Sequence, residues 1–146
     1  METIIFTLEE LPEIAKQLAK KLKNCQIFTF KGPLGAGKTT LIKELLKDFG
    51  VKDEIISPTF TYMNLYKNAN NEHFYHFDLY RIKTIDDFLM AGFDEFLIDK
   101  SGKCLIEWPE VIEPILKLKR IQTCSIEIDY DLSDDKKRKV QISINN

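Results

Sequence analysis

The sequence predicts an α/β protein: a mixed β-sheet that is parallel around one glycine-rich loop, carries antiparallel additions and is flanked by helices. Three observations support this. A short apolar strand pattern leads into the glycine-rich segment 32–39, and a helical pattern follows that segment directly. Strand and helix patterns alternate in the first half of the chain. Strand patterns dominate the second half.

The first half of the chain gives the clearest elements. Residues 4–6 are apolar and predict a short strand. Thr7 and Glu10 then form a T-x-x-E capping box, and apolar residues at helical spacing predict a helix over residues 8–23. A buried strand is predicted at 26–31. The helix after the glycine-rich segment should end at Gly50, which suits the left-handed position after a helix.

The second half predicts mostly strands. Segments 60–66 and 74–78 form a hairpin pattern around turn residues 68–71. Thr84 should cap a short helix that Gly92 ends, and Pro109 should open another. Further strands are predicted at 104–106, near 121–129 and at 138–144. No repeat or low-complexity linker interrupts the pattern, so residues 1–146 are expected to form a single domain.

Composition narrows the function classes. The 146 residues are 44% hydrophobic and 30% charged, with a formal net charge of −2. That balance argues against a surface that grips nucleic acid by basic excess. No segment suggests a signal peptide or a membrane span, which predicts a cytoplasmic protein with no membrane partner. Cys25, Cys104 and Cys124 lie in or beside apolar stretches and are predicted to be buried free thiols.

Segment 32–39 matches the phosphate-binding P-loop pattern G-x-x-x-x-G-K-[ST]. Its glycines let backbone N–H groups turn toward phosphate oxygens, and the following helix adds its N-terminal donors. The lysine is expected to reach the β- and γ-phosphates of ATP, and the adjacent threonine to ligate Mg²⁺. The predicted nucleotide-binding residues are Gly35, Ala36, Gly37, Lys38, Thr39 and Thr40.

Two carboxylates are candidates for the magnesium and the attacking water. Asp78 and Glu107 each end an apolar strand pattern, where a side chain reaches the sheet edge at which ligands bind. Taken singly, either could be an ordinary surface carboxylate. Thr59 lies in a Ser-Pro-Thr segment that could meet the γ-phosphate, and His76 could be a catalytic base or a core histidine.

The motifs in their order resemble those of the TsaE family, the small ATPase of bacterial tRNA threonylcarbamoyladenosine synthesis. They are G-P-L-G-A-G-K-T-T, S-P-T-F-T, H-F-D-L-Y-R, G-F-D-E at 92–95 and L-I-E-W-P-E at 105–110. The resemblance covers nearly the whole chain. It implies a P-loop fold, ATP and Mg²⁺ binding, and slow hydrolysis that resets a complex of a TsaD-type transferase and a TsaB-type companion. That pair modifies position 37 of tRNAs reading ANN codons, so tRNA would be only an indirect partner.

The resemblance also assigns roles to matching positions. It implies that Glu107 is a metal-associated acid and that Asp78 is required for turnover, so both are expected to act in catalysis and at the metal with Thr39. It places Thr59 in a switch-like loop. The family's N-terminal segment covers the base of the nucleotide, which makes Glu10 a candidate contact.

Other functions remain open at this point. A small-molecule kinase would share the P-loop, but a kinase lid usually brings several arginines to the phosphoryl group, and this chain has only three. A nucleotide-gated binding module without significant turnover would need Asp78 and Glu107 for binding alone. Direct tRNA binding through residues 136–139 is a further idea, although that basic run is expected to lie in a solvated hairpin turn.

Overall fold

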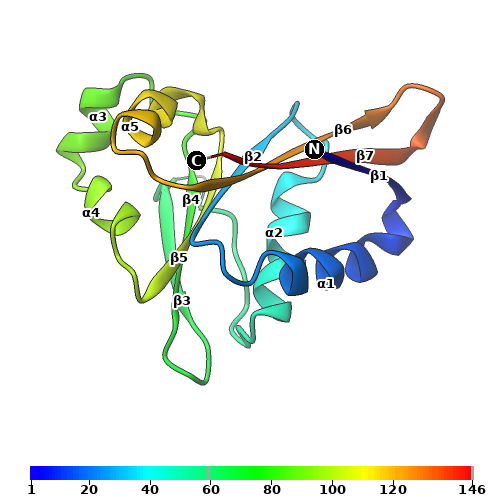
Figure 1. The fold of residues 1–146 in the computed structure, drawn as a ribbon, viewed down its shortest axis with the longest axis horizontal. Coiled ribbons are helices and arrows are strands. Elements are labelled where there is room, and N and C mark those ends of the chain that lie inside the picture. The colour runs from blue at the N-terminus through cyan, green and yellow to red at the C-terminus, as the bar shows by residue number, and fades with distance from the viewer. Residues whose placement is uncertain (59, 146) are drawn as a thin grey trace.

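The computed structural model describes residues 1–58 and 60–145, and its centre is a seven-stranded sheet with the order β1-β7-β6-β2-β5-β4-β3 (Figure 1). The strands are β1 (Glu2–Thr7), β2 (Ile27–Lys31), β3 (Met63–Lys67), β4 (His73–Asp78), β5 (Gly102–Glu107), β6 (Thr123–Asp131) and β7 (Asp134–Asn145).

The sheet is parallel at its centre and antiparallel at both sides. Strand β2 pairs in parallel with β5 and β6, and β5 pairs in parallel with β4. The pairs β1–β7, β6–β7 and β3–β4 are antiparallel. This is the predicted fold class, a mixed sheet that is parallel around the glycine-rich loop, and it is confirmed.

Helices cover both faces of the sheet. Helices α1 and α2 lie on one side in Figure 1, and α3, α4 and α5 lie on the other. The α-helices are α1 (Leu11–Lys21), α2 (Lys38–Asp48), α3 (Ile85–Met90), α4 (Asp94–Leu97) and α5 (Glu113–Leu118). Two 3₁₀ helices, η1 (Leu8–Glu10) and η2 (Pro109–Ile112), precede α1 and α5.

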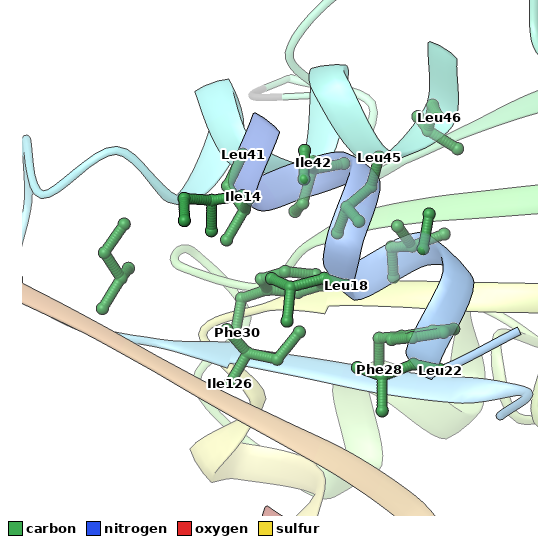
Figure 2. Packing of buried hydrophobic residues seen from close by; sticks show 14 of the residues in the cluster. Ile14, Leu18, Leu22, Phe28, Phe30, Leu41, Ile42, Leu45, Leu46 and Ile126 are labelled. Carbon is green, nitrogen blue, oxygen red and sulfur yellow. The ribbon is translucent and has the colours of Figure 1, made fainter. Parts of the chain in front are cut away.

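The larger core lies under α1 and α2 and fixes the helix that follows the glycine-rich loop. Figure 2 shows Ile14 and Leu18 of α1 and Leu41 and Leu45 of α2 pointing toward Phe30 and its neighbours on the central strands. Apolar residues recur every three or four positions along both helices, so each helix buries one face. The beginning of α2, which carries Lys38 and Thr39, is therefore held rigidly against the sheet.

Two local predictions were wrong. The strand predicted over 60–66 begins only at Met63, because Tyr62 has a φ of 64° and its N–H bonds the Pro58 carbonyl at 2.9 Å in a turn. The basic run 136–139 lies on β7 and not in the hairpin turn. Strands β6 and β7 extend farther than predicted, so the turn shrinks to residues 132–133.

The cysteine prediction is corrected for two of the three residues. Cys25 and Cys124 form a disulfide with a Cα–Cα separation of 6.5 Å, although 99 positions separate them in sequence. Cys25 lies just before β2, and β6 pairs with β2 so that Cys124 faces Phe28. Parallel strand pairing thus brings the two residues together, which no local pattern reveals. Cys104 is a free, buried thiol as predicted, and burial raises its pKa to about 12.

Candidate phosphate and metal site

The predicted site lies where the parallel strands end. The segment 32–39, called the glycine loop below, connects the end of β2 to the start of α2. The neighbouring strands β5 and β4 end at Glu107 and Asp78, which are paired in register. Ligands of open α/β sheets bind at the carboxyl ends of the strands, so the topology alone brings the two acids beside the loop.

Close packing against β6 demands glycine in this loop. A Cβ at Gly32 would lie 2.0 Å from the carbonyl oxygen of Ile128, and the residue has a φ of +147°. Gly35 has a φ of +78°, and a Cβ there would lie 3.1 Å from the Tyr130 hydroxyl. A side chain at position 32 would push the loop off the strand, whereas at position 35 it is the left-handed backbone that favours glycine.

Lys38 begins α2 and is only 5% exposed. Its ammonium donates a hydrogen bond to the Gly32 carbonyl and lies 3.4 Å from the centroid of the Trp108 ring. Burial lowers the pKa of Lys38, while the carboxylates of Glu107, Glu110 and Asp78 oppose that shift. Within the described chain, no carboxylate comes within ion-pair distance of it. Lys38 is thus a buried cation ready for an anionic partner.

Glu107 links the start of α2 to strand β4. The Thr39 hydroxyl donates a hydrogen bond to Glu107 Oε1 at 2.7 Å. The other carboxylate oxygen, Oε2, lies 2.7 Å from His76 Nε2. His76 and Glu107 are 0% and 3% exposed at their side chains. Three side chains from a helix and two strands therefore form one hydrogen-bonded chain, which is buried at His76 and Glu107 and half-buried at Thr39.

Asp78 stands beside this chain and is more accessible. Its Oδ1 accepts a hydrogen bond from the Tyr80 N–H at 3.1 Å, which fixes the turn after β4. Burial raises the pKa of the Asp78 carboxyl and nearby Glu107 adds to the shift, while the Tyr80 N–H, His76 and Lys38 oppose it. A carboxylate with a raised pKa beside a site is a candidate for holding or accepting a proton.

One cavity of about 240 Å³ joins most of the predicted residues. Lys38, Thr39, Asp78 and Glu107 face it together, so one ammonium, one hydroxyl and two carboxylates converge. Such a set can hold a phosphate anion and a hard cation side by side. The lining residues are Leu34, Gly35, Gly37, Lys38, Thr39, Thr40, Asp78, Glu107 and Trp108.

Two predicted residues of the described chain, Ala36 and Glu10, do not line this cavity. Ala36 is fully buried behind the loop surface. Glu10 is exposed, and its carboxylate accepts the Thr7 N–H at 3.1 Å, which completes the predicted capping box. Its contact with a nucleotide therefore stays a prediction. Thr59 lies outside the described residues.

Sequence reasoning missed the support behind the glycine loop. Arg138 of β7 is 9% exposed, and its Nε donates to the Ala36 carbonyl at 3.2 Å. Its Nη1 donates to the carbonyls of Asp135 and Lys137, and its guanidinium lies 4.2 Å from the Tyr130 ring centroid. Arg138 was predicted only as part of a basic run. The residue type was the one feature of the sequence that could have indicated this role, since a guanidinium group can donate to several acceptors at once.

A larger cavity lies on the other face of the sheet but is a weaker candidate. It measures about 300 Å³ between α5 and strands β2 and β6. Lys31, Lys117 and Arg120 line it. Lys31 forms an ion pair with Glu113 and is also attracted electrostatically by Glu110 and Glu127. Glu113 offsets the charge of Lys31 and is the only carboxylate among the described lining residues, so this cavity lacks the two acids that the site at the glycine loop offers.

Comparison with known proteins identifies the family of this chain. The family model "Threonylcarbamoyl adenosine biosynthesis protein TsaE" matches residues 5–140. The chain is 39% identical over 138 residues to a Rickettsia felis protein named tRNA threonylcarbamoyladenosine biosynthesis protein TsaE, covering 94% of this chain and 76% of that one. A protein of the same name from Aquifex aeolicus is 34% identical over 143 residues, covering 97% and 94% of the two chains.

A solved structure supports the fold as well. The crystal structure of YdiB from Bacillus subtilis superposes with a TM-score of 0.67 and 27% sequence identity. The match covers 99% of this chain and 86% of that one. The similarity therefore extends over the whole sheet and its helices and is not confined to the glycine loop.

Proposed function

This chain belongs to the TsaE family, which acts in tRNA threonylcarbamoyladenosine biosynthesis, and we propose that it serves this pathway as a slow Mg-dependent ATPase. The convergence of Lys38, Thr39, Glu107 and Asp78 on one cavity carries the proposal. A phosphate chain with its magnesium needs a cation, a hydroxyl ligand and an acid, and this cavity offers all three at the start of a helix.

The donor set fits magnesium. Thr39 supplies a hydroxyl oxygen, and Glu107 and Asp78 supply carboxylate oxygens at the same edge of the sheet. Mg²⁺ prefers hard oxygen ligands, and usually takes one or two carboxylates together with phosphate oxygens and water. No cluster of three or more His, Cys, Asp or Glu side chains suited to a metal occurs in the described residues, which fits a cation held partly by nucleotide. When bound, the ion would supply charge neutralisation at the phosphates.

The protein's own groups divide the remaining work. Lys38 would exchange its contact with the Gly32 carbonyl for phosphate oxygens, since a buried ammonium gains more from an anion than from a carbonyl dipole. The backbone N–H groups at the start of α2 would bind the same anion. Asp78 would orient water at the γ-phosphate, because it lines the cavity without being held by Thr39 or His76.

The proposed partners act in the same pathway. In this proposal the protein acts on a complex of a TsaD-type transferase and a TsaB-type companion. It does not transfer the threonylcarbamoyl group itself. It would touch tRNA only indirectly and would work in the cytoplasm, where tRNA is modified. No helix of the described residues is long and apolar enough to span a membrane.

Phosphate release from ATP tests this function. The purified chain should release phosphate slowly, and the cognate TsaD–TsaB pair should raise that rate. Lys38→Ala should lower nucleotide affinity about 100-fold, which is the value of two charge-assisted hydrogen bonds to phosphate. Lys47→Ala, on the exposed side of the same helix, is the matched control. Phosphorylation of a small molecule, with no response to the pair, would instead establish a kinase.

A further inference from the structure

We infer that His76 is a positioning residue that holds Glu107 through a proton on Nε2, and that Glu107 in turn fixes the direction of the Thr39 hydroxyl. The inference about the hydrogen-bonded chain rests on the geometry alone. Its consequence for magnesium rests on the proposed function. His76 touches no reacting group in this scheme, so it acts only through the carboxylate.

The first step is the direction of the hydrogen bond. His76 Nε2 lies 2.7 Å from Glu107 Oε2, and both side chains are almost entirely buried. A carboxylate can only accept, so Nε2 must carry the proton. A buried carboxylate without this donor would be uncompensated, which explains why a polar ring occupies the centre of a sheet.

The other ring nitrogen of His76, Nδ1, has different surroundings. Among the buried side-chain polar atoms of the described residues, His76 Nδ1 alone has no hydrogen-bond partner. A proton there would be buried without any acceptor, whereas a bare lone pair is tolerated more easily. The geometry therefore favours a proton on Nε2, the nitrogen that faces Glu107.

Glu107 in turn orients the Thr39 hydroxyl, which faces the cavity. With Oε2 held by His76, Oε1 of Glu107 stays fixed as the acceptor for the Thr39 hydroxyl at 2.7 Å. Once the hydroxyl proton is committed to Glu107, the lone pairs of Thr39 Oγ1 are directed away from the carboxylate. They are then available to a cation in the cavity that both residues line. Outer partners of metal ligands commonly set affinity in this way.

The tautomer can be measured without nucleotide or metal. The chain has two histidines, so His73→Gln leaves His76 as the single one. A long-range ¹⁵N–¹H spectrum of this variant, free of ligands, should show a proton on Nε2. A bare Nε2, with the only ring proton on Nδ1, would overturn the inference whatever the activity of the protein.

The effect on the metal needs a matched pair of variants. His76→Gln can still present an amide N–H to Glu107, whereas His76→Asn carries the same amide on a side chain one methylene shorter. ADP affinity is measured with Mg²⁺ and with a chelator, using the fluorescence of Trp108, the single tryptophan, which lies against Lys38. His76→Asn should lose about tenfold of the gain that Mg²⁺ gives, and His76→Gln should keep most of it.

The outcomes separate the two claims. Affinity in chelator should be unchanged in both variants. Equal losses with and without Mg²⁺ would mean that His76 is merely structural, and would overturn the positioning role. If the unmodified protein gains nothing from Mg²⁺, the metal part of the proposed function fails and the role toward metal fails with it. The tautomer spectrum would still decide the hydrogen-bonded chain by itself.

Discussion

The two antiparallel hairpins flank the central parallel strands on opposite sides, and they contribute different chemistry. Hairpin β3–β4 joins the sheet through β5. It brings Asp78 to the cavity and His76 to Glu107, which lines the cavity. Hairpin β6–β7 joins it through β2 and brings Tyr130 and Arg138 behind the glycine loop. Neither of these last two residues lines the cavity.

The hairpin β3–β4 therefore supplies groups for the chemistry, and the hairpin β6–β7 supports the glycine loop. The β3–β4 side presents one acid, Asp78, which lines the cavity, and one ring, His76, which bonds the Glu107 side chain. The β6–β7 side interacts with loop backbone: Arg138 holds the Ala36 carbonyl, and the Ile128 carbonyl leaves room only for glycine at position 32. We therefore expect changes on the first side to alter turnover, and changes on the second to alter stability and affinity together.

Among the variants, Asp78→Asn should have the largest effect, and that effect should be on the rate of ATP hydrolysis. The amide keeps an oxygen that can accept the Tyr80 N–H, so the turn after β4 should survive. It cannot accept a proton or carry charge, so the rate of ATP hydrolysis should fall about 100-fold or more. ADP affinity, measured by titration, should stay within about threefold, since Lys38 and the loop are untouched.

Asp53→Asn is the control for that change, because it removes the same charge from an exposed position that does not line the cavity. Equal losses of affinity and turnover in Asp78→Asn would make Asp78 a binding residue. That result would favour a nucleotide-gated module over an ATPase.

Arg138→Ala should have a smaller effect, on stability and on nucleotide affinity. The change removes the guanidinium that bonds three carbonyls and stacks on Tyr130. Thermal and denaturant unfolding should show a loss of about 2 kcal/mol in the free energy of unfolding. Nucleotide affinity should fall about tenfold as the loop loosens, which corresponds to about 1.4 kcal/mol. Turnover at saturating ATP should change far less.

Lys136→Ala tests whether the charge of β7 matters apart from its contacts, because Lys136 is exposed on the same strand. If both variants weaken binding equally, and salt screens that loss, the basic run acts through its electrostatic field. A loss confined to Arg138→Ala would show support of the loop.

The contrast between the hairpins also explains how far the sequence could predict the site. Asp78 and Glu107 end apolar strands beside a glycine loop, so local patterns reveal both the residue and its place. His76 was visible as a candidate, but its partner was not, since strand pairing alone brings it to Glu107. Arg138 contacts Ala36 across 102 positions, and no local period carries such information.

The same reasoning applies to the fold. The strand–loop–helix unit and the caps at Thr7, Thr84 and Gly50 follow from nearby residues, and the structure has them. The disulfide between Cys25 and Cys124 depends on β2 lying beside β6, which sequence patterns did not specify. Strand order is a property of the whole chain, so predictions that need it fail where predictions from short segments succeed.

The smallest expected effect concerns the pH dependence of stability. Burial raises the pKa of Asp78, so the charged carboxylate costs stability at neutral pH, and the cost is relieved as pH falls through the raised pKa. Asp78→Asn should thus be more stable than the unmodified protein near pH 7, by on the order of 0.5 kcal/mol for a half-exposed group. Urea unfolding at a series of pH values should show this gap shrinking toward pH 4, near the pKa of an unfolded aspartate at about 3.9. A gap that widens on acidification would mean that the folded state stabilises the charged form. A variant that is more stable but slower would show that the chemical side of the sheet gives up stability for function, as the supporting side does not.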